Sequence, residues 1–327
     1  MTETTHPRVG LVGAGGISSS HLPHLLSLGA DVLVYAADGA EDLVRTYGGS
    51  TASSLEELLA KVDIVDVATP THTHYAITRQ ALESGLDVIS EKPLARTDTE
   101  TAELLDLADT MGAKLYPAHV VRYFPAYARL RQAVRDGVLG DLAVLRFFRS
   151  GAFPARSAWF GDVRLSGGII LDQMIHDLDV ARWLAGEVVS VSATRNRRGP
   201  DASPVEVAHV VLTHASGAIS QVSGVWGPAH LRFTTGYYVA GTAGVLEYDS
   251  AAERDYVADL ARPFDGGELV PDTDPAEDPY FLVLEDLMSA ITTGSQPRTT
   301  AAEGAAAVRL GNAALQSAES GQTIRLG

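Results

Sequence analysis

The sequence contains no cysteine at any of its 327 positions. This absence excludes disulfide bonds, thiolate metal ligands and a cysteine nucleophile, and it fits a reducing compartment. Long apolar runs are absent as well, so no segment reaches the length of a membrane-spanning helix. The stretch 1–8 is polar and lacks the apolar region of a signal peptide. We therefore expect a cytoplasmic protein with no membrane partner.

The chain also has few basic residues. It contains 41 acidic residues against 25 lysines and arginines, which leaves a formal net charge of −16. Nucleic acid is a polyanion, so we expect no nucleic-acid partner and interpret the charge as a contribution to solubility. Only three of the 25 basic residues are lysines, namely Lys61, Lys92 and Lys114. In a chain that relies on arginine, a lysine can mark a position that needs a titratable ammonium group.

The length of the chain and its 46% content of apolar residues are enough for two globular domains. Within residues 1–120, short apolar runs alternate with helical patterns. The runs that read as strands are 8–12, 32–35, 64–68, 87–90 and 115–118. This alternation predicts an α/β domain with a parallel sheet that is covered by helices on both faces.

The remainder, residues 121–327, is organised differently, because several strand-like runs follow one another with little helix between them. We expect strands at 142–148, 188–194, 207–213, 218–225 and 231–239, and helices at 126–136, 169–184, 281–291 and from Thr300 to near Gly321. The segments 151–168 and 195–204 read as loops. Consecutive strands of this kind predict an antiparallel sheet in a second domain.

A glycine pattern follows the first expected strand. Gly13, Gly15 and Ser18 form a variant of the dinucleotide-binding fingerprint, with Gly16 and Ile17 at the start of the next helix. The first glycine permits a tight turn, the second allows backbone to approach a pyrophosphate, and the helix start offers unpaired N–H groups. A plain glycine turn is the alternative, but the position between a strand and an amphipathic helix favours phosphate binding.

Other candidate residues follow the ends of the expected parallel strands, where ligands bind in such sheets. Asp38, after the second strand, is suited to bind the adenosine ribose, although a turn aspartate before Gly39 is equally compatible. No arginine stands beside it to hold a 2′-phosphate, which favours NAD over NADP, with NADP still possible. The other strand ends expected at this crevice carry Thr69, Pro70, Thr71, His72 and His74, and then Glu91, Lys92 and Pro93.

The segment 169–179 carries a second cluster of chemistry-bearing side chains. On a helix, Asp172 and His176 share one face, and a carboxylate beside an imidazole fixes its tautomer and raises its basicity. This pair suits acid–base catalysis, whereas a surface ion pair is the alternative. Asp179 completes a possible metal-ligand set, which we disfavour because no second histidine stands at ligand spacing. We therefore expect no metal.

Three further positions are less distinctive. Lys92 reads either as an ammonium aimed at a substrate hydroxyl or as a loop ion pair with Glu91. Arg122 stands where the two domains are expected to join, and Trp159 lies in the loop before the Asp172 helix. Trp159 is as compatible with a wall for a sugar as with a plug for its loop, while His72 reads as an ordinary loop histidine.

Taken in order, these motifs resemble the glucose-fructose oxidoreductase/inositol dehydrogenase family, also called Gfo/Idh/MocA. The matching pieces span nearly the whole chain and are 13–17 with 21–23, 68–70 with His72 and His74, 91–93, 122–125, 167–179, Glu285-Asp286 and 300–318. The resemblance implies a Rossmann domain, here 1–120, and a second α/β domain, here 121–327, with a large, open, mostly antiparallel sheet. In one arrangement that it allows, the C-terminal helix of the second domain packs back on the first.

The resemblance also implies function. It identifies Lys92, Asp172 and His176 as the catalytic set, with Arg122 and Trp159 added as substrate contacts. It implies sugars, polyols and inositols as substrates and a homo-oligomer, dimer or tetramer, formed through the exposed sheet face. We expect reversible hydride transfer between a secondary hydroxyl and the nicotinamide. The alternatives are transient oxidation by tightly held NAD in a net non-redox elimination or glycoside cleavage, and a sensor of dinucleotide or sugar without turnover.

Overall fold

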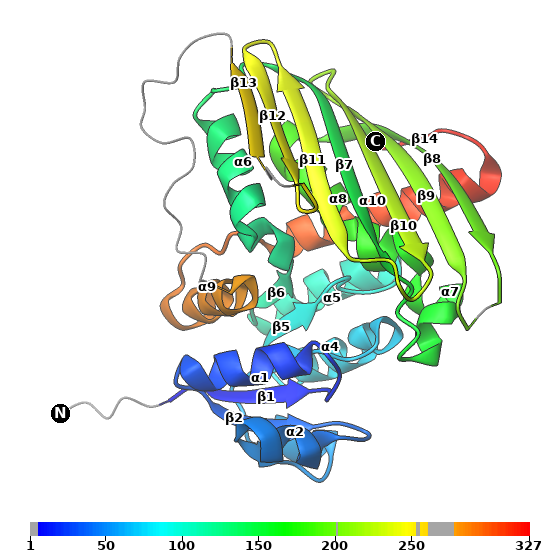
Figure 1. The fold of residues 1–327 in the computed structure, drawn as a ribbon. Helices are drawn as coiled ribbons and strands as arrows, with labels where there is room; N and C mark the ends of the chain where they lie inside the picture. Colours follow the sequence, from blue (N-terminus) through cyan, green and yellow to red (C-terminus); the bar gives the residue numbers. More distant parts are fainter. Residues whose placement is uncertain (1–5, 201, 253–255, 261–277) are drawn as a thin grey trace. The chain divides into compact units, whose positions relative to one another are not determined.

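The computed structural model describes residues 6–200, 202–252, 256–260 and 278–327. Residues 1–5, part of the polar start of the chain, lie outside the described residues. The chain groups into two compact units, Met1–Tyr123 with Pro275–Ala305 and Phe124–Asp274 with Ala306–Gly327. The sequence predicts a boundary after residue 120, and the structure adds the segment 275–305 to the first unit (Figure 1).

The first unit contains a six-stranded parallel sheet with strand order β3-β2-β1-β4-β5-β6, which is the order of a Rossmann fold. Each strand that the sequence predicts here is present, because each is a short apolar run that becomes buried. The strands are β1 (Arg8–Val12), β2 (Asp31–Tyr35), β3 (Ser50–Thr51), β4 (Ile64–Val67), β5 (Asp87–Glu91) and β6 (Leu115–Ala118). Strand β3 is an addition at the edge that the sequence analysis did not anticipate.

Helices cover both faces of this sheet, and helix α5 shows how the sequence sets their limits. The Thr97 hydroxyl accepts a hydrogen bond from the Glu100 amide while the Glu100 carboxylate accepts one from the Thr97 amide, so the predicted capping box is confirmed. The helices of the unit are α1 (Ser18–Ser27), α2 (Ala40–Tyr47), α3 (Leu55–Leu59), α4 (His74–Glu83), α5 (Asp98–Met111) and α9 (Pro279–Thr293).

The second unit contains an eight-stranded sheet with order β13-β12-β11-β7-β10-β9-β8-β14, parallel only between β7 and β10. The predicted large, mostly antiparallel sheet is therefore confirmed. Its strands are β7 (Leu142–Ala152), β8 (Val188–Arg198), β9 (Val205–His214), β10 (Ile219–Gly227), β11 (Thr234–Gly241), β12 (Gly244–Asp249), β13 (Tyr256–Leu260) and β14 (Ile324–Arg325).

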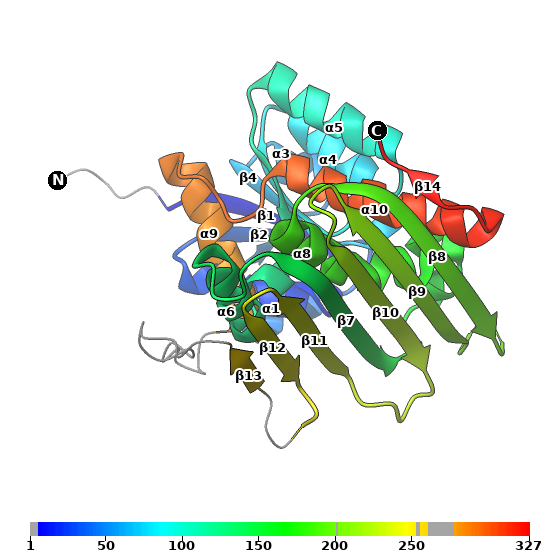
Figure 2. The same ribbon diagram turned by 90° about the horizontal axis from the view of Figure 1, so that it is seen from above.

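One face of this sheet is covered by helices of the same unit (Figures 1 and 2). These are α6 (Pro125–Arg135), α8 (Ile175–Ala185) and the part of α10 (Ala301–Ser320) that follows residue 305. On the other face the strands present exposed apolar side chains that alternate with buried ones, including Phe148, Val205, Val211 and Ile219. Among the described residues no helix is both long and apolar enough to cross a bilayer.

Both predicted loops are partly wrong, and the segment 151–168 contains the end of β7 and the short helix α7 (Val163–Ser166). The sequence predicts a loop from 195 to 204, but β8 continues to Arg198. The reason is an acidic partner on the neighbouring strand, because the buried Glu206 carboxylate accepts a hydrogen bond from Arg195 Nε at 2.8 Å and lies 3.5 Å from Arg197 Nη1. The polar sequence of this segment suggests a loop, but these two arginines pair with Glu206 and the segment to Arg198 forms a strand.

Candidate active site

The glycine loop between β1 and α1 has the geometry that a dinucleotide pyrophosphate requires. Gly13 has φ +121°, and a Cβ atom there would lie 2.3 Å from the Ala68 carbonyl oxygen, so only glycine fits. By contrast, no described atom lies within 4 Å of a Cβ built on Gly15, which is exposed together with Gly16. Ser18 is fully buried, as close packing of the helix on the sheet demands.

The start of α1 is open to a ligand. Within the described part of the chain no side chain caps the helix at Ile17, so the first-turn amides are not satisfied by a capping oxygen. Unpaired amides and the positive end of the helix dipole favour an anion at this position. Gly13, Gly15, Gly16 and Ile17 thus form a loop that fits the phosphates of NAD.

A hollow of about 630 Å³ adjoins the end of β2 and is lined by residues 36–42, 51–53 and 57. Asp38 lines it. Among the described lining residues there is no lysine or arginine, whereas Glu41, Asp42 and Glu57 add negative charge. The Lys61 ammonium and the Ser53 hydroxyl and amide hold the pKa of Glu57 at about 2, so this carboxylate stays charged.

The turns after β4 and β5 are joined by one buried imidazole. His74 is 1% exposed, its Nδ1 lies 2.7 Å from the Pro93 carbonyl oxygen, and its Nε2 lies 2.8 Å from that of Thr69. Burial lowers the pKa of His74, against the opposing effect of these two carbonyl groups. His74 therefore connects the two predicted cofactor-binding turns, while Thr69 and Pro70 remain half-exposed and His72 exposed.

Lys92 follows the last residue of β5 and is half-buried. The Lys92–Pro93 peptide bond is cis, and the Lys92 amide donates to Glu91 Oε2 at 3.1 Å. The Glu91 side chain is buried and lies 3.5 Å from an imidazole. Its inward partner is His21 on α1, which the sequence analysis did not identify as a functional residue.

In the second unit, Asp172 lies in a π-helical turn, Ile170–Met174, which leads directly into α8. From Ser166 to Ala181 every residue is buried except Asp172 and His176, which are half-exposed. The helix thus presents a carboxylate and an imidazole where a ligand can reach them. π-Helical turns of this kind occur frequently at functional sites.

A buried ion pair and a buried carboxylate fix the position of this helix within the second unit. Arg149 on β7 donates to both oxygens of Asp177, Nε to Oδ2 at 3.0 Å and Nη2 to Oδ1 at 2.8 Å. Burial raises the pKa of Asp177, although the Arg149 charge opposes this shift. At the start of the helix, Glu206 accepts from the Ile169 amide at 3.1 Å. The residues that flank Asp172 and His176 are therefore anchored on both sides.

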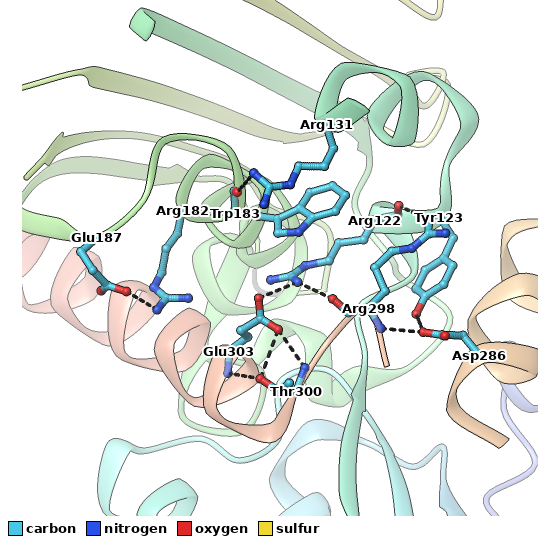
Figure 3. A network of polar contacts seen from close by, with 10 residues as sticks. All are labelled: Arg122, Tyr123, Arg131, Arg182, Trp183, Glu187, Asp286, Arg298, Thr300 and Glu303. Carbon is cyan, nitrogen blue, oxygen red and sulfur yellow. Dashed lines mark hydrogen bonds and ion pairs between the residues drawn. The ribbon is translucent and has the colours of Figure 1, made fainter. Parts of the chain in front are cut away.

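Arg122 is completely buried in the first unit, and Figure 3 shows its polar partners. Its Nη1 donates to the Arg298 carbonyl oxygen at 2.8 Å and to Glu303 Oε1 at 2.9 Å. The same Glu303 closes the predicted capping box with Thr300. The structure thus places Arg122 in a clamp that attaches the start of α10 to residues 120–123, a role that the sequence analysis did not anticipate.

Trp159 is half-buried in the second unit and stacks on Phe160 with ring centroids 3.8 Å apart. One face of the indole ring is thus occupied by a neighbouring aromatic ring.

No grouping of three or more histidine, aspartate or glutamate side chains that could hold a metal ion occurs among the described residues. Asp179, the third member of the metal set considered above, is 3% exposed.

The structure therefore distributes the predicted catalytic set between the units, with Lys92 in the first and Asp172 and His176 in the second. Within the first unit it brings together the strand ends that carry Gly13, Thr69 and Glu91. The sequence motifs do not indicate the buried partners of these residues, such as Asp66 beside His21. The alternation of apolar residues in β4 offered a signal, because Asp66 interrupts an otherwise apolar buried strand.

Two family profiles match the chain. Residues 7–119 match the profile described as an oxidoreductase family with an NAD-binding Rossmann fold, and residues 127–247 match a GFO/IDH/MocA C-terminal domain. Among curated proteins the chain is similar to myo-inositol 2-dehydrogenase of Thermotoga maritima, with 27% identity over 98% of both chains. It is also similar to 1,5-anhydro-D-fructose reductase of Ensifer adhaerens, with 28% identity over 98% of both chains.

A solved structure of similar fold is levoglucosan dehydrogenase in complex with NADH and levoglucosan. Its TM-score is 0.86 at 21% identity, and the match covers 98% of this chain and 99% of that one. At this identity the likeness concerns the fold.

Proposed function

The chain belongs to the Gfo/Idh/MocA oxidoreductase family, and on this premise we propose that it transfers a hydride between NAD and a secondary hydroxyl or carbonyl group of a sugar, polyol or inositol-like substrate. One observation carries the proposal. Asp172 and His176 are the half-exposed residues in the otherwise buried stretch 166–181, and an imidazole beside a carboxylate suits proton transfer to or from a hydroxyl. Inositol and anhydrosugar relatives supply the substrate class.

In this proposal the residues have separate roles. NAD, when bound, supplies the hydride acceptor. His176 removes the hydroxyl proton, and Asp172 orients the imidazole and stabilises its charged form. Lys92 donates a hydrogen bond to the reacting oxygen, which carries increasing negative charge as its proton leaves. The residues assigned to NAD are Gly13, Gly15, Gly16, Ile17, Asp38, Thr69, Pro70, Thr71 and the Glu91-Lys92 turn.

We assign two predicted site residues an indirect role. Arg122 has no exposed surface, and its Nη1 is bonded to the Arg298 carbonyl oxygen and to Glu303, so we propose that it holds the start of α10. The buried ring of His74 lies between the Pro93 and Thr69 carbonyl groups and, when neutral, donates to one of them, so we propose that it positions the cofactor-binding turns. Trp159 keeps its predicted role as an apolar wall for the substrate, since Phe160 supports its ring.

The preference for NAD over NADP is also part of the proposal. A 2′-phosphate carries up to two negative charges, and the hollow at Asp38 is lined by four carboxylates. Like charges disfavour this phosphate, while the carboxylate of Asp38 can accept hydrogen bonds from a free ribose hydroxyl. We further propose a cytoplasmic location, because a chain without cysteine suits a reducing compartment.

A homo-oligomer is the partner that the second sheet favours. Phe148, Val205, Val211 and Ile219 are 36–43% exposed on its open face, and apolar patches on soluble proteins often mark interaction sites. We propose that a second copy of the chain covers this face.

The test of the catalytic proposal is to screen polyols, inositols and aldoses with NAD and to compare the wild type with His176→Ala. Removal of an acid–base group lowers turnover by about 10²–10⁴-fold. The dissociation constant of NADH should change little, because His176 is not among the cofactor ligands. The control is His24→Ala, since His24 lies on α1 with 21% of its side chain exposed.

Unchanged turnover in His176→Ala would remove this residue from the mechanism. Net conversion of substrate without NADH production would instead favour transient oxidation by a retained cofactor. Binding of NADH without turnover of any compound in the screen would favour a sensor.

A further inference from the structure

Three ionisable side chains lie buried beneath the Lys92 turn. His21 on α1 is completely buried, and its Nδ1 lies 2.8 Å from Asp66 Oδ2 on β4. Its Nε2 lies 3.5 Å from Glu91 Oε1, at the end of β5. Asp66 is 0% exposed and Glu91 is 6% exposed, so this imidazole connects two carboxylates from neighbouring strands away from solvent.

This arrangement requires a charged imidazole. A neutral histidine carries one N–H group, so its second nitrogen would direct a lone pair at a carboxylate. Two buried carboxylates without a cation between them would also be very unfavourable, because unpaired charges are costly in the protein interior. An imidazolium donates to Asp66 and presents its second N–H to Glu91. The net charge of His21, Asp66 and Glu91 together is then −1.

The second oxygen of the Glu91 carboxylate is bonded to the backbone of Lys92. Glu91 Oε1 faces His21, whereas Oε2 accepts a hydrogen bond from the Lys92 amide at 3.1 Å. On the other side of the turn, His74 holds the Pro93 carbonyl group at 2.7 Å. Two buried imidazoles therefore fix the residues before and after Lys92, but only His21 does so through a carboxylate.

We propose that His21 is a positioning residue for Lys92: as an imidazolium it bridges Asp66 and Glu91 and thereby holds the turn that presents the Lys92 ammonium. The inference rests on the proposed function, in which Lys92 contacts the reacting oxygen. His21 itself contacts neither substrate nor cofactor in this proposal.

The electrostatics of the site agree with this geometry. Burial alone would lower the pKa of His21, but the charge and hydrogen bond of Asp66, and then those of Glu91, raise it to about 10. Burial alone would raise the pKa of Glu91, but His21, assisted by Lys92 and His74, lowers it. Among the described residues, the titratable side chain of Tyr280 on α9 also packs against the ring, at 6.4 Å between ring centroids.

The small number of lysines allows a direct test. Because the chain has only Lys61, Lys92 and Lys114, protein labelled with ¹³C and ¹⁵N on lysine gives three side-chain signals, and Lys92→Arg identifies that of Lys92. We expect His21→Gln to shift the Lys92 signal and to leave those of Lys61 and Lys114 in place. The matched control is His24→Gln, on the same helix, which removes a contact of 3.1 Å to Asp278. An unmoved Lys92 signal in folded His21→Gln would overturn the proposal.

Kinetics provide the second readout. We expect kcat of His21→Gln to fall about 10- to 100-fold, as for other residues that orient a functional group indirectly. The KM for the sugar-like substrate and the melting temperature of NADH-bound protein should stay close to those of the wild type. A large fall in the melting temperature would instead indicate a loss of the fold. If Lys92 shifts but no compound is turned over by the wild type, the bridge is supported and the proposed function fails.

A measurement on the wild type covers the case in which His21→Gln does not fold. With ¹⁵N-labelled histidine, one of the ten imidazoles should keep both ring nitrogens protonated at pH 9, with slowly exchanging protons. The variant Asp66→Asn should remove that signature. If no histidine retains an imidazolium signal at pH 9, the bridge does not exist and the proposal is refuted.

Discussion

Substitution of Gly13 by alanine tests the reasoning about the cofactor loop most directly. The change has two costs that the structure separates. First, φ at Gly13 is +121°, a conformation that costs a residue with a Cβ atom about 1–3 kcal/mol. Second, the new methyl group would lie 2.3 Å from the Ala68 carbonyl oxygen and 2.8 Å from its carbon, so backbone must move. Overpacking of this kind costs about 1–3 kcal/mol.

Together these terms amount to about 2–6 kcal/mol, a large part of the stability of an ordinary domain. Two other glycines provide matched controls. Gly85 has φ +75° but open space around a built Cβ atom, so Gly85→Ala measures the conformational cost alone, about 1–2 kcal/mol. Gly15 has neither a positive φ nor a described atom within 4 Å, so Gly15→Ala should leave the free energy of unfolding nearly unchanged.

The assay combines calorimetric unfolding with fluorescence titration of NADH. Gly13→Ala should unfold at lower temperature than Gly85→Ala, whereas Gly15→Ala should melt like the wild type and bind NADH at least tenfold more weakly, because its methyl group takes space assigned to the pyrophosphate. The reasoning is refuted if Gly13→Ala is no less stable than Gly85→Ala. Wild-type affinity in Gly15→Ala would show that the pyrophosphate does not lie over this loop.

Two further predictions follow from the buried imidazole and the open sheet. The stabilisation from His21 is fully present below its unfolded pKa of about 6.5 and is lost as pH rises through its folded pKa of about 10, so between pH 7 and 10 the free energy of unfolding should fall by roughly 3–4 kcal/mol. Chemical denaturation at several pH values should show this fall in the free energy of unfolding. The same fall in His21→Gln would contradict its assignment to His21. Val211→Glu, which places a charge on the open sheet face, should dissociate the oligomer in light-scattering measurements, whereas Met111→Glu on α5 should not. A wild type that is monomeric at micromolar concentration would refute the proposed interface.

Much of the fold could be predicted from sequence because local patterns specify it. The parallel strands of the first unit are short apolar runs, and the capping boxes at Thr97 and Thr300 mark the helix starts that the structure shows. Helix α2 was missed because it has only eight residues, although its apolar residues at 40, 43, 44 and 47 follow helical spacing. The extension of β8 was missed because Glu206, which pairs with Arg195, becomes a neighbour only once the strands are in register.

The candidate site divides in the same way. The glycine loop and the Asp172–His176 spacing are local in sequence and could be predicted. The bridge from His21 to Asp66 joins residues 45 positions apart, and Arg122 and Glu303 are 181 apart. Such pairs depend on how strands and helices pack, which residue type alone does not specify.

The π-helical turn at Ile170–Met174 has a consequence for the length of this segment. Each residue advances an α-helix by about 100°, so one additional residue rotates everything before it relative to everything after it. The Glu206 anchor at Ile169 and the Arg149 anchor at Asp177 lie on opposite sides of this turn, and together they fix the number of residues between them. A deletion of one residue here would therefore rotate Asp172 relative to the anchored residues of α8, although both side chains proposed for the chemistry would still be present.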